Sequence, residues 1–389
     1  MRNEEMLLVP GPTPVVDEIY DALASETRGH TDPRFVEIYK RSIENTKTLF
    51  NTDGEVYVVA GSGTLAMEMA IVNTVGKGER LLIISHGYFG DRFTPLAKAY
   101  GIEVDVLQSA WGEQVDTKLI EETLAQGDYK AVTVTHADTS TGVVSDLEVL
   151  IPLIKATGAL VIVDGVVATA AMEEDMGKAY GGNPTYKIDI VLTGSQKAIG
   201  VPPGIAIIAF SQQALAARAK LGTVRAYYAD IENWRGVMNN PGTYFATPPV
   251  NLIYAYDEAL KIVLAEGMEK RSMRHVKFGK GVRAALRVYG MIPLAEENVA
   301  APTLSCMLYP GGVVDVDFRA SLAERGVIVA GSLAHLAGKA FRIGHMGNVT
   351  ADMLEQAVRY IGEALAEQHI QVNIEAAVAA FQKEVAITV

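Results

Sequence analysis

Between about residues 55 and 210, short apolar runs alternate with segments that have helical spacing. The runs are EVYVVA (55–60), RLLIIS (80–85), KAVTVTH (130–136), ALVIVD (159–164) and DIVLT (189–193). Segments such as TLAMEMAIVNTV (64–75) and DRFTPLAKAYG (91–101) separate them. Strands that are apolar on both faces, with helices between them, are typical of a parallel sheet covered on both sides. The pattern therefore predicts an α/β fold with a mostly parallel central sheet.

The pattern changes at two places. GIAIIAFS (204–211) follows a Pro-Pro turn too closely for a crossover helix, so we expect it to pair antiparallel. NLIYAYDEALKIVLAEG (251–267) predicts a long helix leading into a smaller α+β domain that contains TLSCMLY (303–309) and AFRIGHMG (340–347). The apolar stripe of this helix is Leu252, Tyr256, Leu260 and Val263, and that of a later helix over 351–368 is Leu354, Val358, Ile361 and Leu365. We predict a large domain over 15–250 and a small one over 251–389.

Composition narrows the class of protein. The 389 residues allow two domains, and 49% hydrophobic with 21% charged residues is typical of a globular chain. A formal net charge of -12 argues against nucleic acid or an anionic membrane as a partner. The N-terminus does not resemble a signal peptide and no apolar run approaches the roughly 20 residues that span a bilayer, so we expect a soluble, cytoplasmic protein. The single cysteine, Cys306, excludes an internal disulfide and a thiolate metal cluster, and we predict no metal site.

In an open parallel sheet, ligands bind at the carboxyl ends of the strands. Here those ends read VVAGSGT, IISHGYFG, VTHADTSTG, VIVDG and VLTGSQK. They supply hydroxyl, aromatic, acidic and lysine side chains. We therefore predict one site at this edge of the sheet.

The turn AGSGT (60–64) has the features of an anion site. Its backbone N–H groups and the start of the following helix can bind a phosphate, and Ser62 and Thr64 add hydroxyls. The turn also matches the G-x-G-x-x-A dinucleotide fingerprint, but the next strand ends in Ser85 and His86 and not in an acid. A phosphate site of another kind is favoured; the alternative is a glycine turn with a serine N-cap.

Two charged residues end apolar strands. A carboxylate at Asp164 is costly to bury unless it pairs with a cation; the alternative role is to cap the following turn. Lys197, in TGSQKAIGVPPG (193–204), is either an exposed loop lysine or a desolvated amine that reacts with carbonyls. An anion site, an acid and an amine together are what pyridoxal 5'-phosphate requires for its phosphate, its ring nitrogen and its aldehyde.

The order of LLVPGPTPV, AGSGTLAMEMAIVN, HGYFGDR, HADTSTGV, TGSQKAIGVPPG and AFRIGHMG resembles the class V aminotransferases. The alanine–glyoxylate and serine–glyoxylate (serine–pyruvate) branch is the most similar, over nearly the whole chain. The resemblance implies the fold-type I architecture of pyridoxal-phosphate enzymes, a homodimer with sites at the subunit interface, and residues 1–14 crossing near the active site.

The resemblance also implies roles around the cofactor ring. Lys197 would bind pyridoxal phosphate covalently, and Asp164 would bind its pyridine nitrogen. Phe89 would stack on the ring, although a core phenylalanine is the alternative, and Thr139 would lie near the phenolic oxygen.

Further positions would bind the phosphate and the substrate. The resemblance places Gln196 at the phosphate with Ser62, Gly63 and Thr64, and it implies that Tyr244 and Thr247 reach the phosphate of the other subunit. Arg342 would bind the substrate carboxylate, since a planar fork donates two parallel hydrogen bonds; the alternative is a surface ion pair. Gly11 would lie beside the substrate through its backbone.

The resemblance predicts amino transfer from a small amino acid of the alanine or serine type to a 2-oxo acid such as glyoxylate or pyruvate. Three departures leave the substrate open. GVVATAA (165–171) lacks a hydroxyl at Ala168, 172–187 is longer than usual, and the pair His345-Met346 also occurs in branches that use other amines. A phosphonate, sulfonate or ureido amine, with transfer or lyase chemistry, is therefore an alternative.

Three other classes of protein fit less well. A cysteine desulfurase needs a cysteine on a mobile loop, whereas Cys306 lies in a strand-like run. A non-enzymatic subunit of a larger complex would not need the lysine, the aspartate and the anion site together. A nicotinamide-dependent dehydrogenase lacks its acidic strand end.

Overall fold

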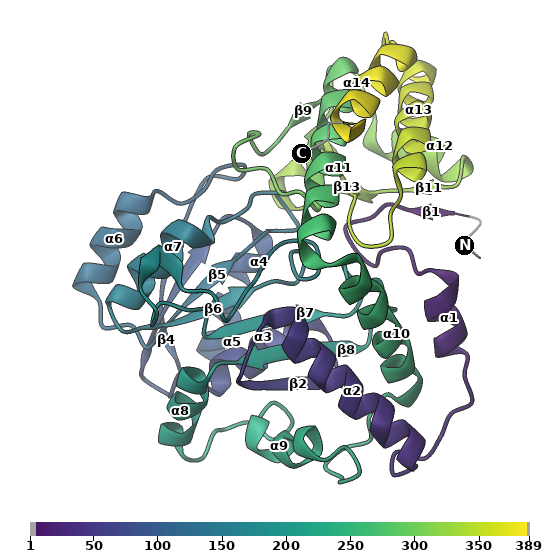
Figure 1. The fold of residues 1–389 in the computed structure, drawn as a ribbon. Helices are drawn as coiled ribbons and strands as arrows, with labels where there is room; N and C mark the ends of the chain where they lie inside the picture. The colour runs from purple at the N-terminus through teal and green to yellow at the C-terminus, as the bar shows by residue number, and fades with distance from the viewer. Residues whose placement is uncertain (1–4, 387–389) are drawn as a thin grey trace.

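A seven-stranded sheet forms the centre of the larger part of the molecule (Figure 1). The computed structural model describes residues 5–386. The strand order is β2-β8-β7-β6-β5-β3-β4. The strands are β2 (Glu55–Ala60), β3 (Arg80–Ser85), β4 (Glu103–Gln108), β5 (Ala131–Thr135), β6 (Leu160–Asp164), β7 (Ile190–Gly194) and β8 (Ile205–Phe210).

The pairing of the strands confirms the predicted mostly parallel sheet. β4, β3, β5, β6 and β7 pair in parallel, whereas β8 pairs antiparallel with both β7 and β2, as the short connection before it predicted. Because β8 is antiparallel to both of its neighbours, β2 and β7 run in the same direction. The carboxyl ends of β2, β3, β5, β6 and β7 therefore meet at one edge of the sheet.

Helices cover both faces of this sheet (Figure 1). The N-cap of α2 (Pro33–Phe50) is Asp32, which accepts a hydrogen bond from the Arg34 amide. Asn51 ends this helix in the left-handed region, at φ 48°. The helices are α1 (Asp17–Leu23), α2 (Pro33–Phe50), α3 (Gly63–Val72), α4 (Tyr88–Asp91), α5 (Phe93–Ala99), α6 (Thr117–Gln126), α7 (Leu147–Ala156), α8 (Gln212–Leu221), α9 (Ile231–Asn239) and α10 (Val250–Glu266). A short 3-10 turn, Tyr180–Gly182, lies in the long segment before β7.

The smaller C-terminal part has an antiparallel sheet in the order β12-β13-β10-β9. Its strands are β9 (Ile292–Pro293), β10 (Leu304–Leu308), β12 (Ala330–Gly331) and β13 (Ala340–Gly344). Its helices are α11 (Met268–Val288), α12 (Asp315–Glu324), α13 (Ala351–Glu367) and α14 (Ile374–Ala386), with a 3-10 turn at Ala334–Leu336. The predicted stripe of α13 is buried against this part's own core, as its helical spacing requires. Within residues 5–386, no helix is both long and apolar enough to cross a membrane.

Helix α10 forms as the sequence predicts, but it packs with the large part. Tyr256, Leu260 and Val263 are buried in the core of the large part, and Asp257 forms an ion pair with Arg41 of α2. Gly267, at φ +79°, separates α10 from α11. We therefore propose that the small domain begins at Gly267, sixteen residues later than the sequence interpretation placed it.

The N-terminal segment 5–14 connects the two parts. β1 (Met6–Leu7) pairs in parallel with β11 (Val327–Ile328) of the small part, and the Gly344 amide donates to the Leu8 carbonyl at 2.7 Å. At its other end, the Thr13 hydroxyl donates to the Lys197 carbonyl at 2.6 Å. This segment therefore passes over the loop that follows β7. Residues 1–4 lie outside the described part of the chain.

Candidate active site

Lys197 lies in the loop after β7 with its side chain enclosed. The residue is 8% exposed, and its Nζ donates to the Pro10 carbonyl at 2.5 Å. Burial, followed by the nearby Arg342 charge, lowers the pKa of Lys197 to about 8, while Asp164 acts in the opposite direction. A much larger fraction of the amine is therefore unprotonated near neutral pH than in an exposed lysine, as a nucleophile requires.

Asp164 ends β6 and is 3% exposed. One oxygen, Oδ1, accepts from the Val166 amide at 3.0 Å, so the residue does cap its turn. No lysine, arginine or histidine lies within ion-pair distance of its carboxylate in residues 5–386. Burial raises the pKa of Asp164 to about 7. An acid held this way has room for a cation and gains free energy by binding one.

The start of α3 has unused donors. Ser62 is its N-cap but makes no side-chain capping hydrogen bond, and within the described chain the amides of Gly63 and Thr64 have no acceptor. A Cβ added at Gly194 would lie 2.8 Å from Oε1 of Gln196 and 3.3 Å from the Gly63 amide, so Gln196 and this helix start face the same space. Two free amides, two hydroxyls and a carboxamide suit an anion.

Phe89 is held in place by an acid on the neighbouring strand end. The amides of Phe89 and Gly90 donate to Oδ2 of Asp138 at 3.0 and 3.1 Å. Arg92 lies over the Phe89 ring, 4.7 Å from its centroid, and its Nη1 donates to the Thr64 hydroxyl at 3.3 Å. The sequence interpretation did not include Arg92, although it ends the quoted motif HGYFGDR. The Phe89 loop and the α3 start are thus adjacent.

Arg342 lies on β13 and is 9% exposed. Its Nε donates to the Gly331 carbonyl at 3.0 Å and its Nη1 to the Thr139 carbonyl at 3.2 Å, which joins the small part to the loop after β5. No acid pairs with it among residues 5–386, so the surface ion pair that the sequence left open is not found. Nη2 makes no hydrogen bond to these residues and can receive a carboxylate.

Gly11 contacts Lys197. Its φ is +106°, and an added Cβ would lie 2.4 Å from Cδ and 2.5 Å from Nζ of Lys197. The close approach and the backbone angle both require glycine at this position. Lys197, Asp164, Arg342, Thr139, Gly11 and the α3 start therefore converge on one site.

Comparison with known proteins identifies the family. The profile of the class-V aminotransferase family matches residues 13–342. The chain belongs to the class-V aminotransferases. An uncharacterized aminotransferase of Methanocaldococcus jannaschii is 35% identical, over 96% of this chain and 97% of that one. Alanine–glyoxylate aminotransferase 1 of Saccharomyces cerevisiae is 36% identical, over 90% and 94%.

A solved structure supports the architecture of this aminotransferase. Ureidoglycine–glyoxylate aminotransferase from Bacillus subtilis superposes with a TM-score of 0.90 at 25% identity, covering 99% of this chain and 98% of that one. The fold is therefore that of the fold-type I aminotransferases, as the resemblance implied.

Two predicted residues of the aminotransferase lie outside the converging set. Tyr244 is 63% exposed, and Thr247 is exposed as well. Their hydroxyls are 3.5 Å apart, and the Tyr244 ring lies 5.2 Å from that of His30. Neither makes a hydrogen bond or ring contact with the strand-end site of its own chain.

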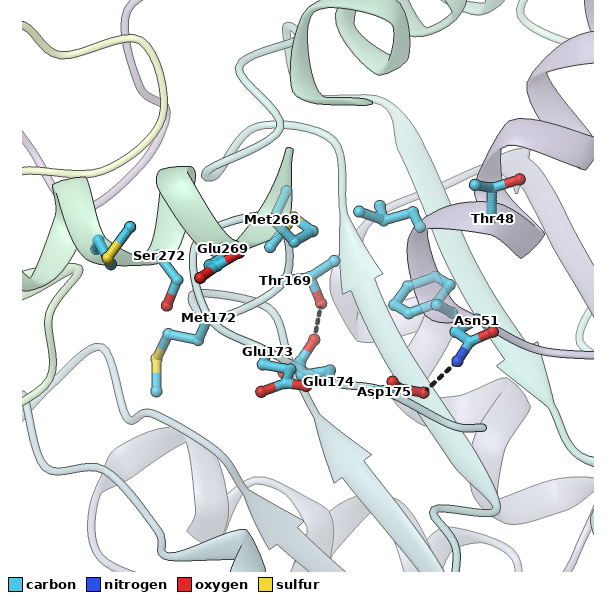
Figure 2. Close-up of a pocket in the computed structure, with 14 residues that line it drawn as sticks. Thr48, Asn51, Thr169, Met172, Glu173, Glu174, Asp175, Met268, Glu269 and Ser272 are labelled. Atoms are coloured by element: carbon cyan, nitrogen blue, oxygen red, sulfur yellow. Dashed lines mark hydrogen bonds between the residues drawn. The ribbon is translucent and has the colours of Figure 1, made fainter. Parts of the chain in front are cut away.

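A cavity of about 550 Å³ lies behind the loop that follows Asp164 (Figure 2). Neither Lys197 nor Asp164 lines it, so it is not the strand-end site. Glu174 lies on its wall and accepts from the Thr169 hydroxyl, while its other oxygen contacts Nδ1 of His136 at 2.8 Å. A Cβ at Gly165 would lie 2.5 Å from the Glu174 carboxylate. Glycine at position 165 therefore leaves room for Glu174, which the long segment 172–187 supplies.

Cys306 is also accounted for in the aminotransferase. It lies on β10 opposite Arg342 and is 2% exposed. Burial raises the pKa of its thiol to about 11. A cysteine in a strand with a protonated thiol lacks the mobility and the reactivity of a desulfurase nucleophile.

Proposed function

We propose that this aminotransferase uses pyridoxal 5'-phosphate to move an amino group from a small amino acid of the alanine or serine type to a 2-oxo acid such as glyoxylate or pyruvate. The observation that carries the proposal is that one site holds both a desolvated amine, Lys197, and a buried acid without a cation partner, Asp164. Burial of the amine and burial of the acid each cost free energy, and binding of an aldehyde and a cationic ring at one site explains why both are kept there.

The residues present fit each part of the cofactor. We assign its phosphate to Ser62, Gly63, Thr64 and Gln196, whose donors are free, and its ring face to Phe89. We assign the ring nitrogen to Asp164 and the aldehyde to Lys197. Thr139, 5% exposed beside Arg342, is assigned to the phenolic edge.

The chemistry divides between cofactor and chain. When bound, pyridoxal phosphate supplies the carbonyl that takes up the amino group and a ring that accepts negative charge. Lys197, freed when the donor's amine takes its place, would accept the donor's α-proton at Nζ and deliver it to the former aldehyde carbon of the bound cofactor, and its pKa of about 8 allows it to act as base and as acid. Asp164 holds a proton on the ring nitrogen, because an ionised buried acid needs a cation beside it. The acceptor is aminated by the same steps in reverse.

Arg342 orients the substrate. Its Nε and Nη1 are fixed by backbone carbonyls, so its free Nη2 can bind a carboxylate without further ordering of the side chain. Gly11 would lie beside the bound substrate, since it contacts the lysine that must react with it. A small donor is supported by the yeast relative's name; a ureido amine, named for the Bacillus subtilis enzyme, is the second candidate because of the similar architecture.

We also propose a homodimer in which Tyr244 and Thr247 reach the phosphate of the partner subunit. Their exposure, together with the free phosphate donors of each chain's own site, supports this arrangement. A cytoplasmic location stays a prediction from the sequence.

Lys197→Ala tests the proposed function. We expect purified wild-type protein to acquire the visible absorbance of bound pyridoxal phosphate and to lose it when the correct amino donor is added. The variant should show neither, because its only amine at the site is gone. Lys187→Ala, an exposed lysine just before β7, is the matched control and should behave as wild type. Retention of the absorbance in Lys197→Ala would contradict the assignment, and a screen of single amino acids would identify the donor.

A further inference from the structure

The first turns of α11 lie directly behind the loops that carry Asp164 and Lys197. Figure 2 shows Met268, Glu269 and Ser272 of α11 facing Thr169 and Met172 of the loop after β6. Arg271, from the same turn, is 1% exposed and points away from solvent. No motif in the sequence singles it out.

The guanidinium of Arg271 bonds to both loops at once. Its Nε donates to the Ala170 carbonyl at 2.6 Å, and its Nη2 donates to the Ala198 carbonyl at 2.7 Å. Ala170 lies in the turn that follows Asp164, and Ala198 follows Lys197 directly. The third nitrogen, Nη1, pairs with Glu266 at 2.5 Å. A single planar group thus links two backbone positions, one in the turn six residues after the acid and one directly after the amine.

The next turn of α11 extends the link to the third loop. His275 donates from Nδ1 to the Arg271 carbonyl at 2.6 Å and accepts at Nε2 from the Gly347 amide at 2.9 Å. Gly347 follows β13, which carries Arg342, and an added Cβ there would lie 3.3 Å from the Lys197 carbonyl. Arg271 and His275 therefore connect the chain segments of all three principal site residues.

The position of Arg271 has a cost that packing alone does not explain. An arginine loses hydration when it is fully buried, and burial lowers its pKa accordingly. Ala170, its acceptor, has φ 65°, in the left-handed region that is strained for a non-glycine residue. A well-packed apolar residue would avoid the first cost but could not hold the Ala170 carbonyl in that orientation.

We propose that Arg271 is a positioning residue, which fixes the distance between Asp164 and Lys197 by bonding to the loop that follows Asp164 and to the backbone directly after Lys197. The inference rests on the proposed function, since it assigns those two residues to one cofactor. Arg271 touches neither substrate nor cofactor in this scheme. It acts through the two loops, and lysine cannot replace it, because a single ammonium lacks the fork that spans two carbonyls.

Arg271→Met and Arg271→Lys test the proposal. We expect pyridoxal phosphate to bind roughly tenfold more weakly to both variants, because a small misplacement of reacting groups has a large effect. The pH at which condensation of the apoprotein with pyridoxal phosphate is half-maximal should lie near 8 in wild type and about one unit higher in the variants, because Lys197 becomes less enclosed.

Arg274→Met is the matched control. Arg274 lies three residues later on α11 and pairs with the same Glu266; it also donates to the Gly347 and Val349 carbonyls, but it bonds to neither Ala170 nor Ala198. It should lose stability without a shift in that pH midpoint. If Arg271→Lys keeps the wild-type affinity and midpoint, or if Arg271→Met unfolds more easily while its folded fraction keeps the wild-type midpoint, Arg271 is only structural and the proposal is wrong. If wild-type protein itself does not bind pyridoxal phosphate, the proposed function fails instead.

Discussion

Burial disfavours the charged form of both Asp164 and Lys197, which is the form that each would have at the surface. Burial raises the pKa of the acid to about 7 and lowers that of the amine to about 8, so the two groups titrate in the same pH range although their usual values lie far apart. Paired shifts of this kind are typical of groups that exchange protons with a ligand. The free energy of unfolding of the protein without cofactor is therefore sensitive to pH.

Asp164→Asn should stabilise the protein without cofactor at alkaline pH. Because the folded-state pKa of about 7 lies above the usual 3.8, the stabilising contribution of the neutral acid is complete below about pH 4 and is lost as pH rises through 7. At pH 8 the variant should therefore unfold at a higher temperature than wild type, with an unfolding free energy larger by at most about 4 kcal/mol. Near pH 4 the two proteins should not differ. Thermal unfolding across this range measures it.

The same change at Asp189 is the contrast. Asp189 accepts from the buried Lys155 ammonium at 2.7 Å, so Asp189→Asn leaves that charge unpaired and should destabilise the protein at pH 8. Equal destabilisation by the two substitutions at pH 8 would show that Asp164 also has a cation partner, contrary to our description.

Gly11→Ala should abolish the reaction of Lys197 with pyridoxal phosphate. The new Cβ would overlap the lysine side chain at 2.4 Å, and φ of +106° is strained for alanine. We expect condensation to slow by about a hundredfold or more. Gly29→Ala, where nothing lies within 4 Å of the added carbon, should leave the rate unchanged. A normal rate in Gly11→Ala would mean that the segment over Lys197 yields easily.

At the scale of elements, the apolar pattern predicted the strands of the seven-stranded sheet that are buried on both faces, but it did not predict the edge strand β4. β4 has the sequence EVDVLQ and is half-exposed at the sheet edge, so its polar residues concealed it. The two-residue pairing of β1 with β11 is too short to leave a periodic signal and joins positions far apart in the chain. Local pattern predicts an element only when burial is distributed regularly along it.

The start of α3 is an element whose capping residue has another use. Because Ser62 makes no capping bond, Ser62→Ala should change the unfolding free energy little, while pyridoxal phosphate binds several-fold more weakly. Ser211→Ala gives the opposite result, since Ser211 caps α8 by accepting from the Ala214 amide: about 1 kcal/mol less stability and unchanged binding. Both are measured by denaturant unfolding and cofactor titration. Equal loss of stability in the two variants would argue that Ser62 is an ordinary N-cap.

At the scale of the whole molecule, the motifs located the site, but not what holds it together. Lys197, Asp164, Arg342 and Gly11 are recognisable because each stands in a characteristic run of neighbours. The Arg271 side chain behind Lys197 belongs to a distant segment, and nothing in its local sequence indicates its contacts with the backbone of the two loops. The residues that position the reactive groups therefore depend most on tertiary contacts, which the local sequence does not reveal.

A mixing experiment tests whether sites are shared between subunits. Lys197→Ala and Tyr244→Ala homodimers should both be nearly inactive. When they are mixed and exchange subunits, one site of each heterodimer would combine Lys197 of one chain with Tyr244 of the other, so activity should recover to about one quarter of wild type. Chromatography with light scattering checks the dimer. If exchange is complete and no activity returns, Tyr244 serves its own chain.

The segment over Lys197 has a consequence for the biosynthesis of the protein. Its β1 pairs with residues 327–328, and its Leu8 carbonyl is held by Gly344, so residues 6–8 find these partners only after residues 327–344 have been synthesised. The seven-stranded sheet can form long before then. We therefore expect a nascent chain to carry Asp164 and Lys197 in a folded sheet while the site is still open on one side, and to close the segment over Lys197 only after residue 344 has been synthesised.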